Sequence, residues 1–141
     1  ARAGDGRGGV LQEGPGYGAV TPWYPLLPFT TAGFLGRNIW NESQFFKEMV
    51  FSMIYATTPA PTSRKDDSAV TYELFPFNDS EYPQNGSIFY ARKYYGDTMS
   101  VLANQWSTLG VGQYARRWLN RVGPSVSSHV AALDAGPQPS G

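Results

Sequence analysis

The sequence contains no cysteine and a single histidine, His129. The lack of cysteine excludes disulfide bonds, thiolate nucleophiles and cysteine-ligated metal sites. One histidine cannot make a typical zinc site, and we interpret His129 as a surface or packing residue. Carboxylates could hold calcium, but a turn with glycosylation better explains the oxygen-rich cluster of Asn78, Asp79 and Glu81. We therefore expect no metal and no cofactor in this chain, and leave a structural divalent cation open only for other parts of the protein.

An excess of charge and a long apolar run are also missing. Eleven Lys and Arg residues balance eleven Asp and Glu residues, so no net field steers the chain toward nucleic acid or an acidic membrane. Any site for a polyanion must then be a local patch. No stretch approaches the roughly 18 apolar residues of a membrane span. We expect neither a nucleic-acid partner nor a membrane span.

The two ends of the chain have the composition of loops and linkers. Residues 1–19 are rich in glycine, begin without Met and contain no signal-peptide core, which indicates a processed or cut chain. Residues 134–141 have linker composition and predict a tether toward a further C-terminal domain. Because 41% of the residues are hydrophobic, residues 1–133 can bury a core, and we expect them to form one domain or part of one.

Three N-x-S/T sequons lie close together in the sequence, at Asn41, Asn78 and Asn85. Such sequons are the acceptors of N-glycosylation in secreted proteins. Since the absence of cysteine removes the usual marker of an oxidising compartment, the prediction of a secreted, extracellular glycoprotein depends on these three positions.

Hydrophobic spacing predicts a mainly helical fold. The clearest helix spans residues 43–56, where apolar residues recur at spacings of three and four before Thr57-Thr58-Pro59 ends it. The other helices are expected over residues 22–35, 87–95, 98–109 and 113–121. Asp97 is the expected cap of the helix that follows it, and glycines mark the breaks. Residues 57–71 form a polar, proline-broken loop and residues 72–77 an extended segment, and the short glycine turns between helices favour antiparallel helical hairpins.

A glycine-rich segment near the N-terminus is the first candidate for a site. Gln12-Glu13-Gly14-Pro15-Gly16-Tyr17-Gly18 presents one carboxylate and one phenol from a glycine framework. Glycine permits sharp turns and lets a ligand approach the backbone closely, although a purely structural loop would have the same composition.

Further motifs follow this segment in a recognisable order. Asp5-Gly6 and the glycine segment precede an aromatic apolar helix, a second helix that ends near Pro59, the run Phe75-Pro76-Phe77-Asn78-Asp79-Ser80, and Tyr95-Gly96-Asp97. In this order the motifs resemble the toroid domain of heparinase II/III-like polysaccharide lyases and the related uronyl C5-epimerases. The resemblance covers roughly residues 5–120.

The resemblance implies a fold, a reaction and a substrate. The fold is part of an (α/α) toroid built of antiparallel helical hairpins with long ordered loops, normally followed by β-sandwich domains that this chain lacks. The reaction is β-elimination at a uronic acid of an acidic polysaccharide, or C5 epimerisation through the same carbanion. Both need the uronate carboxylate neutralised, together with a base and an acid. In the family, an Asn or His on earlier helices and a His of the β-sandwich supply the remaining groups, so this chain alone would be incomplete.

Residue by residue, the resemblance assigns Tyr17 as the catalytic acid or base. A phenol suits that role because adjacent cations can lower its pKa from near 10. Glu13 is predicted to contact sugar hydroxyls or to lock the glycine loop. Trp23 and Tyr24 follow the loop and are candidates for stacking on sugar rings, with core packing as the alternative.

Arg117 and Arg121 complete the predicted substrate-binding residues. They lie one helical turn apart on a predicted helix, a spacing that can grip sulfate or carboxylate groups. A solvated helix face is the alternative interpretation.

Two functions of different classes follow from these patterns. The first is a segment of a secreted polysaccharide lyase or uronate epimerase whose partners are an acidic polysaccharide and the remaining parts of the parent protein. The second is a noncatalytic extracellular glycoprotein that acts as a carbohydrate-binding or structural assembly subunit. The ordered motifs make the first the preferred interpretation. The abundance of aromatic residues, 15% of the chain, the zero net charge and the missing catalytic partners add weight to the second.

Overall fold

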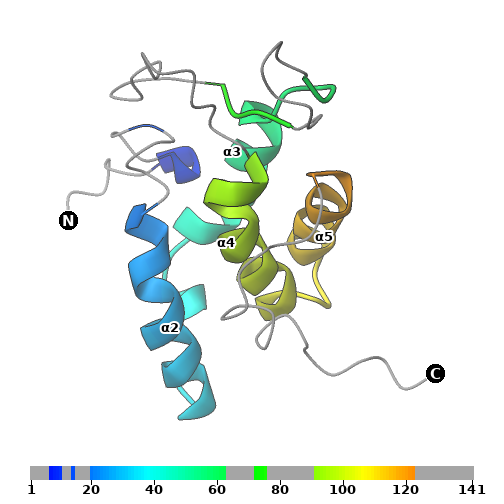
Figure 1. Ribbon diagram of the computed structural model, residues 1–141. Helices are drawn as coiled ribbons and strands as arrows, with labels where there is room; N and C mark the ends of the chain where they lie inside the picture. Colours follow the sequence, from blue (N-terminus) through cyan, green and yellow to red (C-terminus); the bar gives the residue numbers. More distant parts are fainter. Residues whose placement is uncertain (1–6, 11–13, 15–19, 63–71, 76–90, 123–141) are drawn as a thin grey trace.

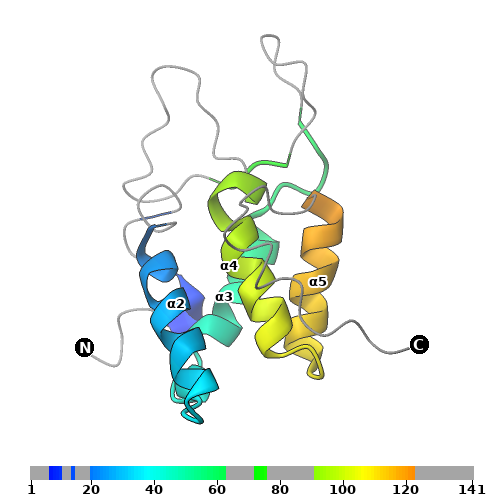
Figure 2. The ribbon, with the colours of Figure 1, turned by 60° about the horizontal axis from the view of Figure 1, so that its bottom comes forward.

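The computed structural model describes residues 7–10, 14, 20–62, 72–75 and 91–122. This part of the chain is mainly helical, as predicted, and contains no β-strand. Its helices are α2 (Val20–Phe34), α3 (Phe45–Ala56), α4 (Ala91–Gln105) and α5 (Gly110–Val122), and two short 3-10 turns, η1 (Arg7–Gly9) and η2 (Ile39–Asn41), accompany them. Figures 1 and 2 show α4 between α2 and α5, and α4 packs on α2, α3 and α5. The central position of α4 explains why every residue from Thr98 to Ala103 is buried.

Helix α3 follows the predicted spacing closely. Phe46, Met49, Val50 and Met53 are buried, and Glu48 is exposed. Ser43 takes part in the start of the helix, because its Oγ accepts a hydrogen bond from the N–H of Phe45 at 3.1 Å. At the other end Thr57 leaves the helix with an extended backbone.

Aromatic rings from four parts of the chain meet in the core. Trp40 of η2 is 1% exposed and lies edge-on to Phe46 of α3, with ring centroids 5.0 Å apart. Phe29 of α2 lies 5.2 Å from Trp40, and Trp106, which follows α4, lies 6.3 Å from it. These edge-to-face pairs add attraction beyond the area that they bury. The cluster therefore joins α2, α3 and the end of α4 around one indole ring.

Helix α4 differs from its prediction. Two helices were expected, with a break at Gly96 and a cap at Asp97, but one helix runs from Ala91 to Gln105. Glycine in a helix interior costs about 1 kcal/mol relative to alanine. Burial of this helix among its three neighbours outweighs that cost, and the predicted break was wrong.

Helix α5 also begins earlier than its predicted start at residue 113. Gly110 and Gly112 were interpreted as breaks, yet both lie inside α5. A Cβ on Gly112 would be 2.0 Å from the carbonyl oxygen of Trp106. Glycine at this position therefore allows close packing of α5 on the turn before it.

Helix α2 runs from Val20 to Phe34, against residues 22–35 expected, and continues through Pro25 and Pro28.

The extended segment predicted at residues 72–77 is described from Tyr72 to Phe75. Leu74 forms an isolated antiparallel bridge with Thr57, and Phe75 N–H donates to the Ala56 carbonyl at 2.7 Å. The segment thus lies beside the end of α3. The predicted linker at residues 134–141 lies outside the described residues.

Candidate functional site

The described part of the glycine-rich N-terminal segment rests directly on α3. The N–H of Gly8 donates to the Glu48 carboxylate at 2.8 Å, and the Ser52 hydroxyl donates to the Gly8 carbonyl. Gly8 and Gly9 have φ angles of 76° and 68°, which favour glycine. The two polar side chains lie one turn apart on α3 and fix the turn η1 on that helix.

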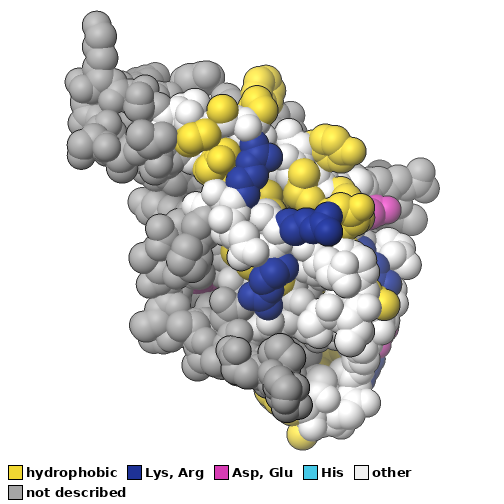
Figure 3. Space-filling model, turned by 90° about the vertical axis from the view of Figure 1, so that its right-hand side faces the viewer, with side chains coloured by type: hydrophobic (Ala, Val, Ile, Leu, Met, Phe, Trp, Pro, Cys, Tyr) yellow, Lys and Arg dark blue, Asp and Glu magenta, His cyan; other side chains and the backbone are white. Residues whose placement is uncertain are grey.

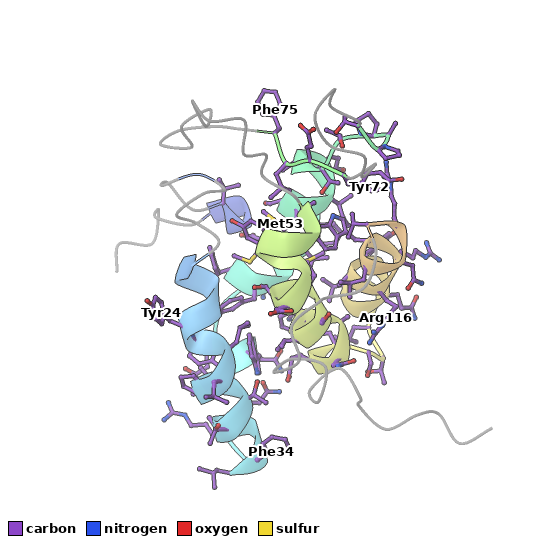
Figure 4. The ribbon with its side chains drawn as sticks, in the orientation of Figure 1. Tyr24, Phe34, Met53, Tyr72, Phe75 and Arg116 are labelled. Atoms are coloured by element: carbon purple, nitrogen blue, oxygen red, sulfur yellow. The ribbon has the colours of Figure 1, made fainter. Side chains whose placement is uncertain are left out.

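A pocket of about 440 Å³ opens beside this contact. Its walls come from the N-terminal segment, the end of α3 and the extended segment, and they are Val10, Ser52, Met53, Tyr55, Ala56 and Phe75. Tyr55 is 86% exposed and Phe75 is 68% exposed, so both rings are accessible. Figure 4 labels two of these residues, Phe75 at the top and Met53 below it. Apolar walls with a few polar groups are typical of ligand pockets of this size.

The aromatic surface continues from the pocket toward α5. Phe51 precedes Tyr55 by one turn of α3, which places both on the same side of that helix. Phe51 contacts Tyr114 of α5, with ring centroids 5.6 Å apart. Tyr55, Phe51 and Tyr114 therefore extend the accessible rings of the pocket to the exposed side of α5.

Arg121, near the end of α5, is held by neutral partners. Its guanidinium donates to the carbonyl oxygens of Thr58, at 3.2 Å, and of Pro59. It also lies over the ring of Tyr72, 5.0 Å from the centroid. These contacts tie α5 to both sides of the Thr57–Leu74 bridge and fix the orientation of the guanidinium.

Arg117 lies one turn before Arg121 and points along the same face. Its guanidinium is 5.9 Å from the ring centroid of Tyr114. Arg116, half-buried beside it, donates to Asn104 Oδ1 of α4 at 2.5 Å. Both predicted arginines are thus at the surface, and Arg121 has a structural role besides any role in binding.

The remaining predicted site residues are distributed as follows. Tyr17 and Glu13 lie outside the described residues, as does the side chain of Trp23, whose backbone belongs to the first turn of α2. Tyr24 on α2 is 73% exposed and does not pack in the core. Tyr24 and Arg116 are on opposite sides of α4 in Figure 4, so the structure does not bring Tyr24 together with the arginines of α5.

Of the three sequons, only that of Asn41 falls within the described residues. The side chain of Asn41 is exposed, and its Oδ1 accepts a hydrogen bond from Trp106 Nε1 at 3.3 Å. Ser43, the third residue of the sequon, contacts the start of α3. This sequon therefore has structural contacts of its own, and glycosylation of Asn41, Asn78 and Asn85 stays a prediction.

Further chemistry is sparse in the described ranges. No three His, Asp or Glu side chains there are grouped so that they could hold a metal ion. Nor does any described helix have the length and apolar character needed to cross a membrane. Tyr95 on α4 is 2% exposed, and burial raises the pKa of its phenol, which stays neutral at physiological pH.

The comparisons with protein-family models, with curated proteins and with solved structures found no match to this sequence.

Sequence reasoning missed the pocket residues Tyr55 and Phe75. The signal in the sequence was the aromatic pair Phe51 and Tyr55, four residues apart and off the apolar face of a helix whose core positions were already assigned. An aromatic pair outside the buried face of a helix is a reason to search for a binding surface. No local pattern shows that Phe75 and Val10 meet it, because those contacts join distant parts of the chain.

Proposed function

We propose that this chain is a segment of a secreted polysaccharide lyase that acts by β-elimination at uronic acid residues, or of a related uronate C5-epimerase. The ordered motifs of the sequence and the mainly helical fold support the proposal. The structural observation behind it is the pocket with the exposed rings of Tyr55 and Phe75 beside the glycine-rich segment. The C–H faces of sugar rings pack well on such aromatic surfaces.

In this proposal Tyr17 is the acid or base. A base removes the C5 proton, which is acidified by the neighbouring carboxylate when hydrogen bonds or cations neutralise that group. In elimination the electron pair of the C5–H bond forms the C4=C5 double bond, the C4–O4 bond breaks and an acid protonates O4. In epimerisation the same carbanion takes a proton on the opposite face of the ring. Groups from other parts of the protein would act with Tyr17.

The test is ultraviolet detection of unsaturated uronate when the intact protein meets alginate, heparan sulfate, chondroitin and glucuronan. We expect absorbance to rise with one of these, and the Tyr17→Phe variant to lose the signal while its circular dichroism spectrum stays unchanged. Normal turnover by Tyr17→Phe would refute the assigned role. No product on any substrate, with retained binding, would favour the noncatalytic alternative of a carbohydrate-binding or structural subunit.

A second experiment tests the pocket. Replacing Tyr55 by Ala removes an exposed ring at little cost to folding and should weaken binding of the substrate oligosaccharide by about tenfold, as expected for loss of an aromatic contact. Phe34→Ala is the matched control, because Phe34 is 83% exposed on α2 and does not line the pocket. Equal affinity of the two variants would remove the pocket from the proposal.

A further inference from the structure

The outward face of α5 concentrates positive charge. The helix carries Arg116, Arg117 and Arg121 and contains no Asp or Glu. Figure 3 shows this side of the molecule, where Lys and Arg side chains lie among hydrophobic ones and acidic side chains are seen only at the margin of the described surface. The chain as a whole has zero net charge, but α5 has a local excess of positive charge.

Two of these cations, Arg117 and Arg121, have no acidic partner among the described residues. Neither Arg117 nor Arg121 forms an ion pair within the part of the chain that the structure describes, where the salt bridge is Arg37 with Glu42. The carbonyl groups that Arg121 contacts satisfy part of its donors but do not neutralise it. A guanidinium has five N–H donors, so its remaining donors can meet a carboxylate or a sulfate.

The spacing of the two arginines suits a polymer. Residues four apart on a helix are separated by about 6 Å along its axis. This separation is similar to the length of one sugar ring, so Arg117 and Arg121 can meet charged groups on neighbouring sugars. Contacts with Tyr114 and Tyr72 limit the freedom of the two guanidinium groups, which lowers the entropy lost on binding.

Aromatic rings connect these cations to the pocket. Arg117 lies on Tyr114, Tyr114 contacts Phe51, and Phe51 lies one turn from Tyr55 in the pocket wall. A polysaccharide offers both apolar ring faces and anionic groups. On this surface, aromatic rings that can pack on the sugar faces lie beside guanidinium groups that can bind the anionic groups.

We propose that Arg117 and Arg121, with Tyr114 and Phe51, form an arginine–aromatic strip that binds the acidic polysaccharide and leads from the pocket across α5. The inference rests on the proposed function and adds a second contact region to it. Helix α5, which carries Arg117, Arg121 and Tyr114, lies across α4 from α2 in Figures 1 and 2, so the strip extends from the pocket away from α2.

The test compares Arg117→Gln with Arg37→Gln in the intact protein. Fluorescent heparan sulfate, chondroitin and alginate fragments are titrated at several salt concentrations, with single-stranded DNA as the competing polyanion. Arg117→Gln should weaken binding of the preferred polysaccharide about tenfold and flatten its salt dependence. Arg37→Gln, which removes a cation paired with Glu42, should bind as the unmodified protein does. Arg117→Lys should recover only part of the affinity, because lysine keeps the charge but not the bidentate geometry.

Unchanged affinity of Arg117→Gln, or a larger loss for DNA than for every polysaccharide, would overturn the strip. Unfolding curves of the variants show whether a loss of binding reflects a loss of folding. Turnover separates the two proposals: product formation that depends on Tyr17 but binding that is insensitive to Arg117 would refute the strip alone. Binding that depends on Arg117 without any turnover would support the strip and refute the lyase or epimerase activity.

Discussion

The backbone of Gly9 lies against the backbone of Met49, so that a Cβ on Gly9 would be 2.0 Å from the Met49 nitrogen and 2.3 Å from its Cα. Backbone atoms of a helix cannot move aside as the end of a long side chain can. Glycine at this position is therefore required for packing of η1 on α3, independently of any ligand. The same contact places Val10 at the wall of the pocket.

The first prediction concerns these neighbouring glycines. Gly9→Ala should destabilise the protein by about 3 kcal/mol or more, because the strain of a positive φ adds to the clash with Met49. Gly8→Ala is the control: its φ of 76° gives similar strain, about 1–2 kcal/mol, but nothing lies within 4 Å of its Cβ position. Urea unfolding measures both, and equal losses would show that η1 does not pack on α3 as described.

Thr57 provides the second prediction. Its buried hydroxyl donates to the Met53 carbonyl and accepts a hydrogen bond from Trp118 Nε1 at 2.8 Å. Thr57→Val keeps the shape but leaves the indole N–H of Trp118 without an acceptor, which should cost about 1–3 kcal/mol of unfolding free energy. Thr57→Ser keeps the hydroxyl and should lose less. A larger loss in Thr57→Ser than in Thr57→Val would contradict the assigned hydrogen bond.

The buried phenol of Tyr95 predicts a loss of stability in alkaline solution. Burial raises its pKa above the ordinary value of 10.0, so the unfolded chain releases this proton at a lower pH than the folded chain does. The free energy of unfolding therefore keeps the full contribution of this phenol below pH 10 and falls as the pH rises above that value. Tyr95→Phe should lessen that decline in unfolding experiments across this range, whereas Tyr24→Phe, at an exposed position, should keep it. Parallel curves for Tyr95→Phe and the unmodified protein would contradict the prediction.

The exposed apolar side chains of helix α2 should make residues 1–141 associate in solution. Its side away from the core exposes Tyr24, Leu27 and Phe34, and neighbouring Leu35 is 82% exposed. Several exposed apolar side chains on one helix promote association. Leu27→Ser combined with Phe34→Ser should raise the solubility of residues 1–141 without loss of helix content, measured by light scattering and circular dichroism. Leu26→Ser, at a position 4% exposed, should instead destabilise the fold. Unaltered association of the double variant would show that α2 is not the surface responsible.

The helices of this chain were predictable where spacing and burial agree. The repeat of Phe46, Met49, Val50 and Met53 defined α3 because the four residues share one buried face. The same reasoning failed at α4, where residues on every side of the helix are buried and a glycine was interpreted as a break. A helix surrounded by neighbours shows little periodicity, and its extent depends on contacts that a local pattern does not contain.

The candidate site was predictable only in part. The i, i+4 spacing of Arg117 and Arg121 correctly placed both residues on α5, because it depends on a helix alone. Arg121 contacts Thr58, Pro59 and Tyr72, and the pocket brings Val10 together with Tyr55 and Phe75. All of these contacts join residues more than forty positions apart. Long-range contacts of this kind leave no periodic signal in the sequence.

The central proposal is that the protein removes the C5 proton of a uronate residue with the participation of Tyr17. Proton nuclear magnetic resonance of the polysaccharide panel in D2O tests it directly, because elimination and epimerisation share this step. We expect an olefinic H4 signal from elimination, or replacement of the C5 proton by deuterium with inversion, with the intact protein and not with Tyr17→Phe. Intact C5–H signals on every substrate, or the same conversion by Tyr17→Phe, would contradict it.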